Sequence, residues 1–440
     1  MIDLSSEQVD FRCLTDRYVR SEIVRGERYL FIEPEAFEIL AREAFAEVSF
    51  YFRRSQLELW AEILDDLQAS ENDKFVAAFL LKNAVVAAQG ILPLCQDTGT
   101  ATVFAMKGHK VLTDGNDVRY LEHGIARAWR ELNLRYSQLA ALDMYNEVNT
   151  GNNLPAQIDI TANKGDSYDF LFVAKGGGSA NKTCFFQETK ALLRPGLLED
   201  YLVEKISYLG TAGCPPYRIV VVIGGSSPEW NLKILKLATC GALKNLPQEG
   251  DSNGRMFRDV GLEERLLRRS RNLPFGAQYG GKYFALEVRV IRLPRHAASL
   301  PLSIGVSCSA DRNILGRITK EGVFLERLDK NPERFLHKIE KAEGLPWVAV
   351  DSRKGIEEVR KALSKCPVGA LVKITGPLTV ARDAAHARIK QLLLEGKPMP
   401  DYFRNYPVYY AGPAKTPQGL PSGSFGPTTS QTVSYTHLTL

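Results

Sequence analysis

The sequence has little of what marks membrane, secreted or nucleic-acid-binding proteins. No apolar stretch approaches the roughly 18–20 residues that span a bilayer. Residues 1–7 show no basic segment followed by an apolar run, so we expect no secretory signal. No block of Lys and Arg with interleaved aromatic residues occurs, and the net charge of +5 is modest for 440 residues. We therefore expect neither a membrane nor a nucleic acid as a partner.

Cysteine is scarce as well, with seven residues in the whole chain. An odd and widely spread set argues against a disulfide framework and favours a reducing compartment, so we expect a cytoplasmic protein. Internal repeats are absent. A hydrophobic content of 45% and a charged content of 24% are those of an ordinary globular protein, and the length allows two to three domains.

Helix and strand signals alternate along the chain and predict an α/β (α+β) fold. Apolar residues near helical spacing predict a helix over 34–68. Ser70, with Asp73 three residues later, predicts the N-cap of a second helix that reaches about Ala88. Further helices are expected over 117–134, 229–244, 330–343 and 354–364. Strands are expected at 158–161, 170–173, 219–223, 283–292, 347–350 and 370–375.

Three cysteines lie far apart in loops where Gly and Pro oppose regular structure. Cys95 lies in loop 93–99, Cys214 in 213–216 and Cys308 in 305–309. Three loop thiolates without a fourth in similar surroundings suggest an iron–sulfur cluster with one open iron, which is a Lewis acid. Alternatively, Cys95 is a free buried cysteine and Asp97 a turn cap.

The other cysteines are interpreted differently. Cys184 follows a glycine loop and is the one serious rival as a ligand. The sequence surroundings of Cys13, Cys240 and Cys366 are those of structural residues.

The segment 175–183 follows a predicted strand and contains three consecutive glycines. It resembles a phosphate-binding loop, since Gly176, Lys182 and Thr183 fit, but the second required glycine is Asn181. A carboxylate-binding loop is therefore favoured over a nucleotide site, with a surface turn as the plain alternative.

Two further segments offer groups for a carboxylate substrate. His296, followed by small residues, could donate to a carboxylate, although a lone histidine is more often structural. Arg382 precedes a predicted helix, where bidentate carboxylate binding and a surface ion pair are both open interpretations.

Taken together, these segments resemble the class I fumarases, which are iron–sulfur fumarate hydratases, from about residue 30 to residue 430. The matching motifs are Cys95-Gln96-Asp97-Thr98-Gly99-Thr100, Asn133-Leu134-Arg135-Tyr136-Ser137, Asp143-Met144-Tyr145, Glu147-Val148-Asn149-Thr150-Gly151, residues 175–182, Cys214-Pro215-Pro216, Arg295-His296, Cys308-Ser309-Ala310-Asp311-Arg312-Asn313 and Gly426-Pro427-Thr428-Thr429.

The resemblance implies a [4Fe-4S] cluster held by Cys95, Cys214 and Cys308. It also implies a hydro-lyase activity that interconverts fumarate and (S)-malate. It also implies a homodimer. The residues that would surround the dicarboxylate are Gln96, Asp97, Arg135, Gly178, His296 and Arg382. Catalytic roles would fall to Asp97, His296 and Thr428, the last matching the family's candidate base. Alternatives are mesaconate or tartrate as the substrate, or a nucleotide at 176–183.

The domain division that follows is a cluster-binding domain over 1–318 and a swivelling β/α domain over 319–430 that closes over the site. After Thr429 the family continues with a small residue and Gly-Arg-Met-Asp, whereas here Ser430 leads into a Ser/Thr-rich segment. The expected arginine falls at Thr432, and a later lysine is missing. We therefore expect an incomplete second domain, a foreign or aberrant tail over 431–440 and a nearly inactive chain.

Overall fold

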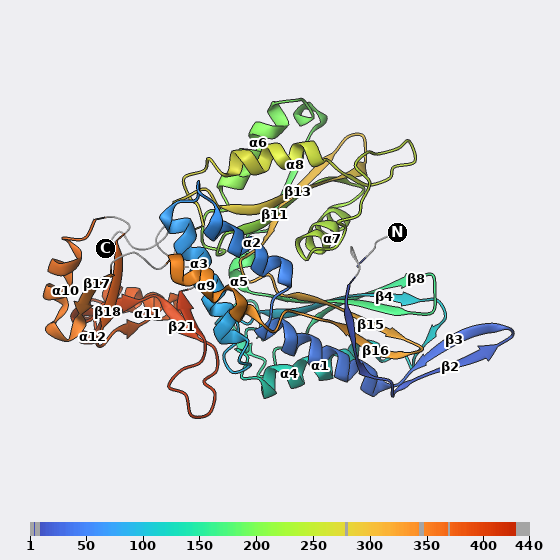
Figure 1. Cartoon of the computed structure of the whole chain (residues 1–440), viewed down its shortest axis with the longest axis horizontal. Coiled ribbons are helices and arrows are strands. Elements are labelled where there is room, and N and C mark those ends of the chain that lie inside the picture. The colour runs from blue at the N-terminus through green and yellow to red at the C-terminus, as the bar shows by residue number, and fades with distance from the viewer. Residues whose placement is uncertain (1–3, 5–8, 278–279, 343–346, 368–369, 428–440) are drawn as a thin grey trace.

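A computed structural model describes residue 4 and residues 9–277, 280–342, 347–367 and 370–427. Two large sheets lie one above the other, with a smaller unit beside them near the C-terminal end (Figure 1). Mixed helices and sheets confirm the predicted α/β fold class. No helix in the described part of the chain is long and apolar enough to cross a membrane.

The first sheet has six strands. Their order is β1 (Phe11–Thr15), β16 (Gly322–Glu326), β15 (Asn313–Thr319), β9 (Tyr168–Lys175), β4 (Thr100–Gly108) and β8 (Gln157–Asn163). Successive side chains on a strand point to opposite faces. Val103 and Ala105 accordingly join the core beneath helices α1 (Pro34–Phe50) and α4 (Asp117–Glu131), while Phe104 and Met106 join a different core on the other face.

The second sheet has five strands. Their order is β10 (Cys184–Glu188), β14 (Leu300–Ser307), β11 (Tyr217–Gly225), β13 (Ala285–Arg295) and β12 (Phe257–Arg258). Its core residues Ile219 and Val221 pack with helices α6 (Leu197–Ser207) and α8 (Val260–Ser270). Val220 and Val222 face the six-stranded sheet instead. The predicted buried strand is thus confirmed, because both faces of β11 are covered.

Helix α7 (Pro228–Thr239) fills the space between the two sheets. Its Ile234 and Leu235 share one core with residues of both sheets. Its N-cap is Ser227, which accepts from the amide of Trp230 at 3.2 Å. The helix ends at Thr239, so Cys240 is its C-cap rather than an interior residue. The layers are therefore helix, sheet, helix, sheet and helix (Figure 1).

The prediction of one helix over 34–68 is wrong, because the chain forms α1 and then α2 (Arg54–Asp65). Between them Tyr51 is extended and the carbonyl of Phe52 accepts from the amide of Asp329 at 2.8 Å. Phe52 packs edge-on against Trp60, with ring centroids 4.9 Å apart. The burial of Phe52 and its backbone hydrogen bond to Asp329 therefore favour an interruption here over a continuous helix.

The second predicted helix is confirmed as α3 (Glu71–Ala87). Ser70 and Asp73 form a full capping box at its start, in which each side chain binds the other residue's backbone amide.

The remaining elements of the N-terminal part are short. They are β2 (Val19–Val24), β3 (Glu27–Ile32), β5 (Val111–Leu112), β6 (Leu139–Ala141), β7 (Glu147–Asn149), α5 (Gly177–Ala180) and η1 (Lys190–Leu192).

The smaller unit is built on parallel strands β17 (Trp347–Asp351) and β18 (Leu371–Thr375). Its other elements are η3 (Ser352–Lys354), α10 (Ile356–Leu363), β19 (Thr379–Val380), α11 (Asp383–Leu394), α12 (Asp401–Asn405), β20 (Val408–Tyr409), β21 (Ala411–Pro413) and β22 (Phe425–Pro427). Trp347 packs on the rings of Phe75 and Phe79, which attaches this unit to α3.

The domain boundary near residue 318 stays a prediction, and the sheet suggests where to refine it. Strand β16 lies beyond 318 but pairs with both β15 and β1. The next elements, η2 (Pro332–Phe335) and α9 (Leu336–Ala342), bury Phe335 and Ile339 in the core around α2 and α3. We therefore propose that the separate C-terminal unit begins with β17.

Candidate active site

The five-stranded sheet positions two of the three loop cysteines. Strands β11 and β14 are antiparallel, with Arg218 opposite Ser307, so Cys214 before β11 and Cys308 after β14 lie at the same edge. The amide of Ser309 donates to the carbonyl of Cys214 at 3.0 Å and ties the loops together. Cys214 adopts a φ of +62°, an uncommon conformation for a residue with a side chain.

Cys95 joins these two residues from the loop after α3. Burial raises the pKa of the Cys214 thiol, and the neighbouring Cys308 and Cys95 raise it further. Burial also raises the pKa of Cys95. The charge of Arg312 lowers this pKa, and those of Asp97 and Cys308 raise it, so all three residues lie near Cys95. The three predicted ligands are thus brought together from three distant segments.

The donor set of three cysteines is compatible with an iron–sulfur cluster. Among the described residues, no group of three or more His, Cys, Asp or Glu side chains has the spacing to hold one metal ion. In an iron–sulfur cluster each cysteine binds a different iron, so the sulfur atoms stand further apart. Burial favours the protonated thiols, and a bound metal would stabilise the thiolates by deprotonating them.

A buried arginine lies beside two of these cysteines. Arg312 has only 4% of its surface exposed, and its charge acts against the raised pKa of both Cys95 and Cys308. Its Nε has no hydrogen-bond partner within the described residues. A cation here favours the negative charge that thiolates bring. Sequence reasoning did not select Arg312, although it lies four residues after Cys308 in a quoted motif.

Asp97 connects the Cys95 loop with the glycine loop. Its Oδ2 accepts from the amide of Gly177 at 2.8 Å, and its Oδ1 accepts from the amide of Gly99 at 3.1 Å. A Cβ on Gly176 would stand 2.9 Å from Oδ2, so this approach requires glycine. The glycine loop therefore binds a carboxylate that belongs to the protein itself.

Gly178 lies on α5 next to the Cys214 loop. A Cβ built on Gly213 would stand 3.2 Å from the carbonyl oxygen of Gly178. The backbone of Gly178 is therefore adjacent to the Cys214 loop.

Arg135 is held against the Cys95 loop by a buried hydroxyl. Its amide donates to Thr98 Oγ1 at 3.0 Å, and the same hydroxyl donates to its carbonyl at 3.2 Å. Asn153, fully buried, accepts from the amides of Ser137 and Gln138 and donates to the carbonyl of Gly99. Arg135 Nη1 is itself buried with no acceptor in the described residues. A bound carboxylate would supply that acceptor.

The C-terminal unit reaches the same place through a two-stranded ribbon. Gly426 on β22 pairs with Gly412 on β21. A Cβ on Gly426 would stand 3.0 Å from Gln96 Oε1, and a Cβ on Gly412 would stand 3.0 Å from Arg382 Cζ. Gln96 and Arg382 thus lie against the same short ribbon, on paired glycines.

Two more contacts attach that ribbon to the N-terminal part. Ser424 Oγ donates to the carbonyl of Pro93 at 2.5 Å, and the Lys415 ammonium lies 3.1 Å from the ring centroid of Tyr136. Both partners flank predicted site residues, namely Cys95 and Arg135. Thr428 follows β22 and lies outside the described residues.

His296 does not lie with the other predicted residues. Strand β13 pairs Arg295 with Gly225, whereas Arg218 at the other end of β11 lies opposite Ser307. Seven residues of strand correspond to roughly 23 Å at ~3.3 Å per residue. His296 is exposed at that far edge, where its Nδ1 accepts from the amide of Ala298 at 3.2 Å. The implied place of His296 beside the cysteines is therefore wrong within one chain, because β14 separates His296 from Cys308 by its full length.

The remaining cysteines occupy other places. Cys184 is exposed on the edge strand β10, opposite Ile304. Cys13 is exposed on β1, and the Cys366 thiol donates to the carbonyl of Ala362 at 3.5 Å near the end of α10. Cys240 is buried between the sheets.

Comparison with known proteins gives long matches. The sequence model of the family described as Fumarate hydratase (Fumerase) matches residues 39–317, and that described as Fumarase C-terminus matches residues 322–438. The chain is 52% identical over 428 residues to "Fumarate hydratase class I, anaerobic" of Escherichia coli (strain K12), covering 97% of this chain and 78% of the relative. It is 51% identical over 417 residues to "Fumarate hydratase 2" of Leishmania major, covering 94% and 73%.

Proposed function

This chain belongs to the Fumarate hydratase (Fumerase) family, and from that premise we propose that it is a class I fumarate hydratase. The reaction is the reversible loss of water from (S)-malate to give fumarate. The observation that carries the proposal is 52% identity over 97% of the chain to a relative of that name. Two features of the site support it. Three cysteines lie together, and Arg135 Nη1 has no acceptor among the described residues.

We infer that Cys95, Cys214 and Cys308 hold a [4Fe-4S] cluster. When bound, such a cluster supplies a Lewis acid through the iron that no cysteine ligates. The rest of the site would consist of this chain's own groups. Arg312 would balance the charge of the ligating thiolates, and Asp97 would be fixed beside them by the amides of Gly99 and Gly177.

The proposed substrate contacts use the two units together. Arg135, whose Nη1 has no acceptor in the described residues, would bind one carboxylate as a planar fork. Arg382 and Gln96, which flank the paired Gly412 and Gly426, would bind groups at the other end of the substrate. Closure of the C-terminal unit would then exclude water from the site.

Dehydration breaks the C3–H bond and the C2–O bond of malate and forms the C2–C3 double bond. Thr428 remains our proposed base for the C3 proton, and it needs activation because a hydroxyl is a poor base at its free pKa. The departing hydroxyl must gain a proton to leave as water, and Asp97, which neighbours Cys95, is the proposed residue that transfers it. Gly178 would contribute backbone contacts only.

His296 can contribute to this site only from a second copy of the chain, given its position at the far edge of the sheet. A homodimer is therefore part of the proposal. Mixing a His296→Ala chain with a Cys95→Ser chain tests it. Each chain alone would be inactive, and a mixed dimer would regain one intact site if His296 acts across the interface.

A nucleotide site at residues 176–183 is not proposed, because the Gly177 amide already binds Asp97. The test of the proposed function is anaerobic reconstitution with iron and sulfide, followed by assays with malate, mesaconate and tartrate. We expect turnover of malate to exceed that of the other two. Faster turnover of mesaconate or tartrate would reassign the substrate, and stabilisation by ATP without iron would refute the proposal.

A further inference from the structure

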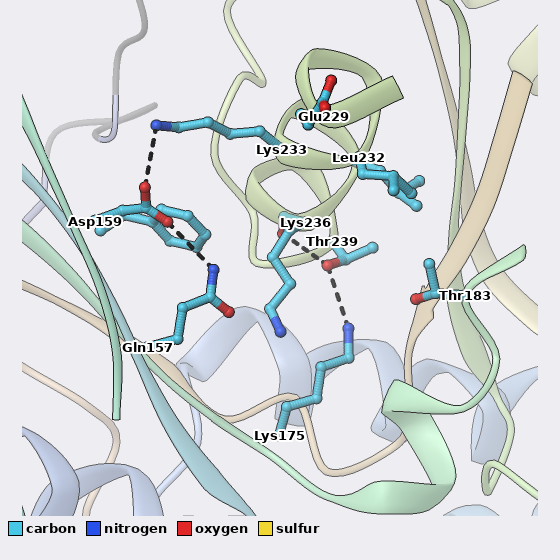
Figure 2. A pocket seen from close by; sticks show the side chains of 11 residues that line it. Gln157, Asp159, Lys175, Thr183, Glu229, Leu232, Lys233, Lys236 and Thr239 are labelled. Carbon is cyan, nitrogen blue, oxygen red and sulfur yellow. Dashed lines mark hydrogen bonds and ion pairs between the residues drawn. The ribbon is translucent and has the colours of Figure 1, made fainter. Parts of the chain in front are cut away.

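A pocket lies between α7 and the six-stranded sheet, and Lys175 lines both it and a small cavity beside Cys308. The pocket has a volume of about 430 Å³. Figure 2 shows Lys175 and Lys236 reaching into it from the sheet side and from α7. None of the described side chains assigned to the proposed active site lines it.

The inner wall of this pocket holds two ammonium groups without an acidic partner. Lys175 Nζ donates to Thr239 Oγ1 at 3.3 Å, and Thr239 in turn donates to the carbonyl of Lys236 at 2.7 Å. No carboxylate in the described ranges lies within ion-pair distance of Lys175 or Lys236. Burial lowers the pKa of Lys175, and the nearby charge of Lys236 lowers it further.

The acidic residues at the rim do not compensate these charges. Asp159 faces Lys233, with Oδ1 and Nζ 3.5 Å apart, and also accepts from Gln157 Nε2 at 3.2 Å (Figure 2). Glu229 is exposed in the first turn of α7, while Lys236 lies in its last turn. Among the lining residues the two lysines therefore keep an excess of positive charge, and Asp311 acts on Lys175 only from outside the pocket.

A purely structural role explains only part of this arrangement. Lys236 complements the negative end of the α7 dipole, which is a common use of a basic residue. Lys175 belongs to no helix, and placing it next to Lys236 in a partly buried position costs free energy because like charges repel. An anion between them would remove that cost.

We propose that this pocket binds a phosphate group, either as inorganic phosphate or as the phosphate of a small ester. Two ammonium groups converging on one place suit a single compact dianion, and lysine binds phosphate as a point charge. No arginine lines the pocket, so the planar fork that suits a carboxylate is missing. The hydroxyl of Thr183 lines the same space and can donate to a phosphate oxygen.

Apolar residues in the lining also leave room for the organic part of an ester. Phe104, Leu232 and Leu235 line the pocket and offer apolar surface to such a group. The proposed site is independent of the hydro-lyase reaction. It adjoins the cysteines, because Lys175 also lines a small cavity together with Cys308. Occupancy is thus expected to alter the electrostatic surroundings of Cys308.

The test is calorimetric titration of the intact chain with inorganic phosphate and with phenyl phosphate, at constant ionic strength set by chloride. Both should bind, phenyl phosphate more tightly because of the apolar lining residues. Lys236→Ala and Lys175→Met should each weaken binding about tenfold or more. Asp159→Asn should tighten it, since it removes a negative charge and releases Lys233.

Lys361→Ala on the exposed face of α10 is the matched control and should change nothing. Arg135→Met separates this pocket from the active site, because it should leave phosphate binding intact. Two results would overturn the proposal. One is binding that Lys236→Ala does not weaken. The other is a Lys236-dependent site that prefers succinate to phosphate. Since Lys236 is only partly buried on a helix surface, that variant should fold even where Lys175→Met does not.

Discussion

The unpaired Nη1 of Arg135 leads to an unusual prediction. Loss of the guanidinium should not lower the stability of the free protein, but it should lower kcat/KM. The change is Arg135→Met, which keeps the apolar stem and removes the charged fork. Arg135 Nη1 is buried without an acceptor in the described residues. A buried unsatisfied donor costs about 1–3 kcal/mol, so its removal should leave the free energy of unfolding unchanged or raise it by up to that amount.

Catalysis should respond in the opposite direction. A hydrogen bond to a charged group contributes about 1.5–3 kcal/mol, and its loss in the transition state lowers kcat/KM about 10–150-fold. Arg135→Lys should show much of the same loss, because an ammonium cannot replace a bidentate fork. The backbone clamp by Thr98 is untouched in both variants, so the loop should keep its position.

Two measurements on the same preparations check this reasoning. Thermal unfolding without substrate gives the stability, and steady-state kinetics with malate gives kcat/KM. The wild type should gain Tm on adding malate and the Arg135→Met variant should not. A variant that is less stable by more than about 1 kcal/mol, yet keeps wild-type kcat/KM, would refute the reading of Arg135 as a substrate ligand.

Three further predictions rest on other groups. Activity should decay in air and return with ferrous iron and thiol under argon, because an iron without a protein ligand is lost first; full activity after chelation would contradict this. Thr98→Val removes both hydrogen bonds to the Arg135 backbone, so KM for malate should rise and stability should fall by about 1–3 kcal/mol, while unchanged kinetics would exclude a positioning role. Arg218 and Arg289 lower the pKa of Glu287 below its ordinary value of 4.5 against the opposing effect of burial, so its ion pairs stabilise the fold above that pH and lose their effect as the pH falls through the lowered pKa. Glu287→Gln should therefore lower Tm at neutral pH, which corresponds to a loss of about 1–3 kcal/mol in the free energy of unfolding. The difference in Tm from the wild type should vanish in acid, and a difference independent of pH would contradict the assignment.

Local signals in the sequence were sufficient wherever neighbouring residues decide the structure. The capping box of Ser70 and Asp73 set the start of α3, and the apolar run of β11 followed from burial on both faces. The interruption at Phe52 could not be predicted, because it depends on pairing with Asp329, far away in the sequence. Helical periodicity carries no information about such a partner.

The site shows the same division. The Gly and Pro context selected three cysteines that the fold does bring together, although the loop predicted over 305–309 is partly wrong, because β14 extends to Ser307. The role of Arg312 could not be predicted from the sequence, because only the three-dimensional packing shows its guanidinium beside two thiols. The sequence also could not show that His296 and Cys308 lie at opposite ends of a sheet, since their distance along the chain is short and the strand β14 between them is extended.

The central claim is that Cys95, Cys214 and Cys308 are the cluster ligands, and iron and sulfide content after anaerobic reconstitution tests it most directly. We expect the wild-type chain to take up the iron and sulfide of a [4Fe-4S] cluster and each of the three Cys→Ser variants to lose it. Cys184→Ser and Cys240→Ser are the matched controls and should retain it, since Cys184 is on an exposed edge strand and Cys240 lies between the sheets. A full cluster in any one of the three variants, or its loss in Cys184→Ser, would contradict the account.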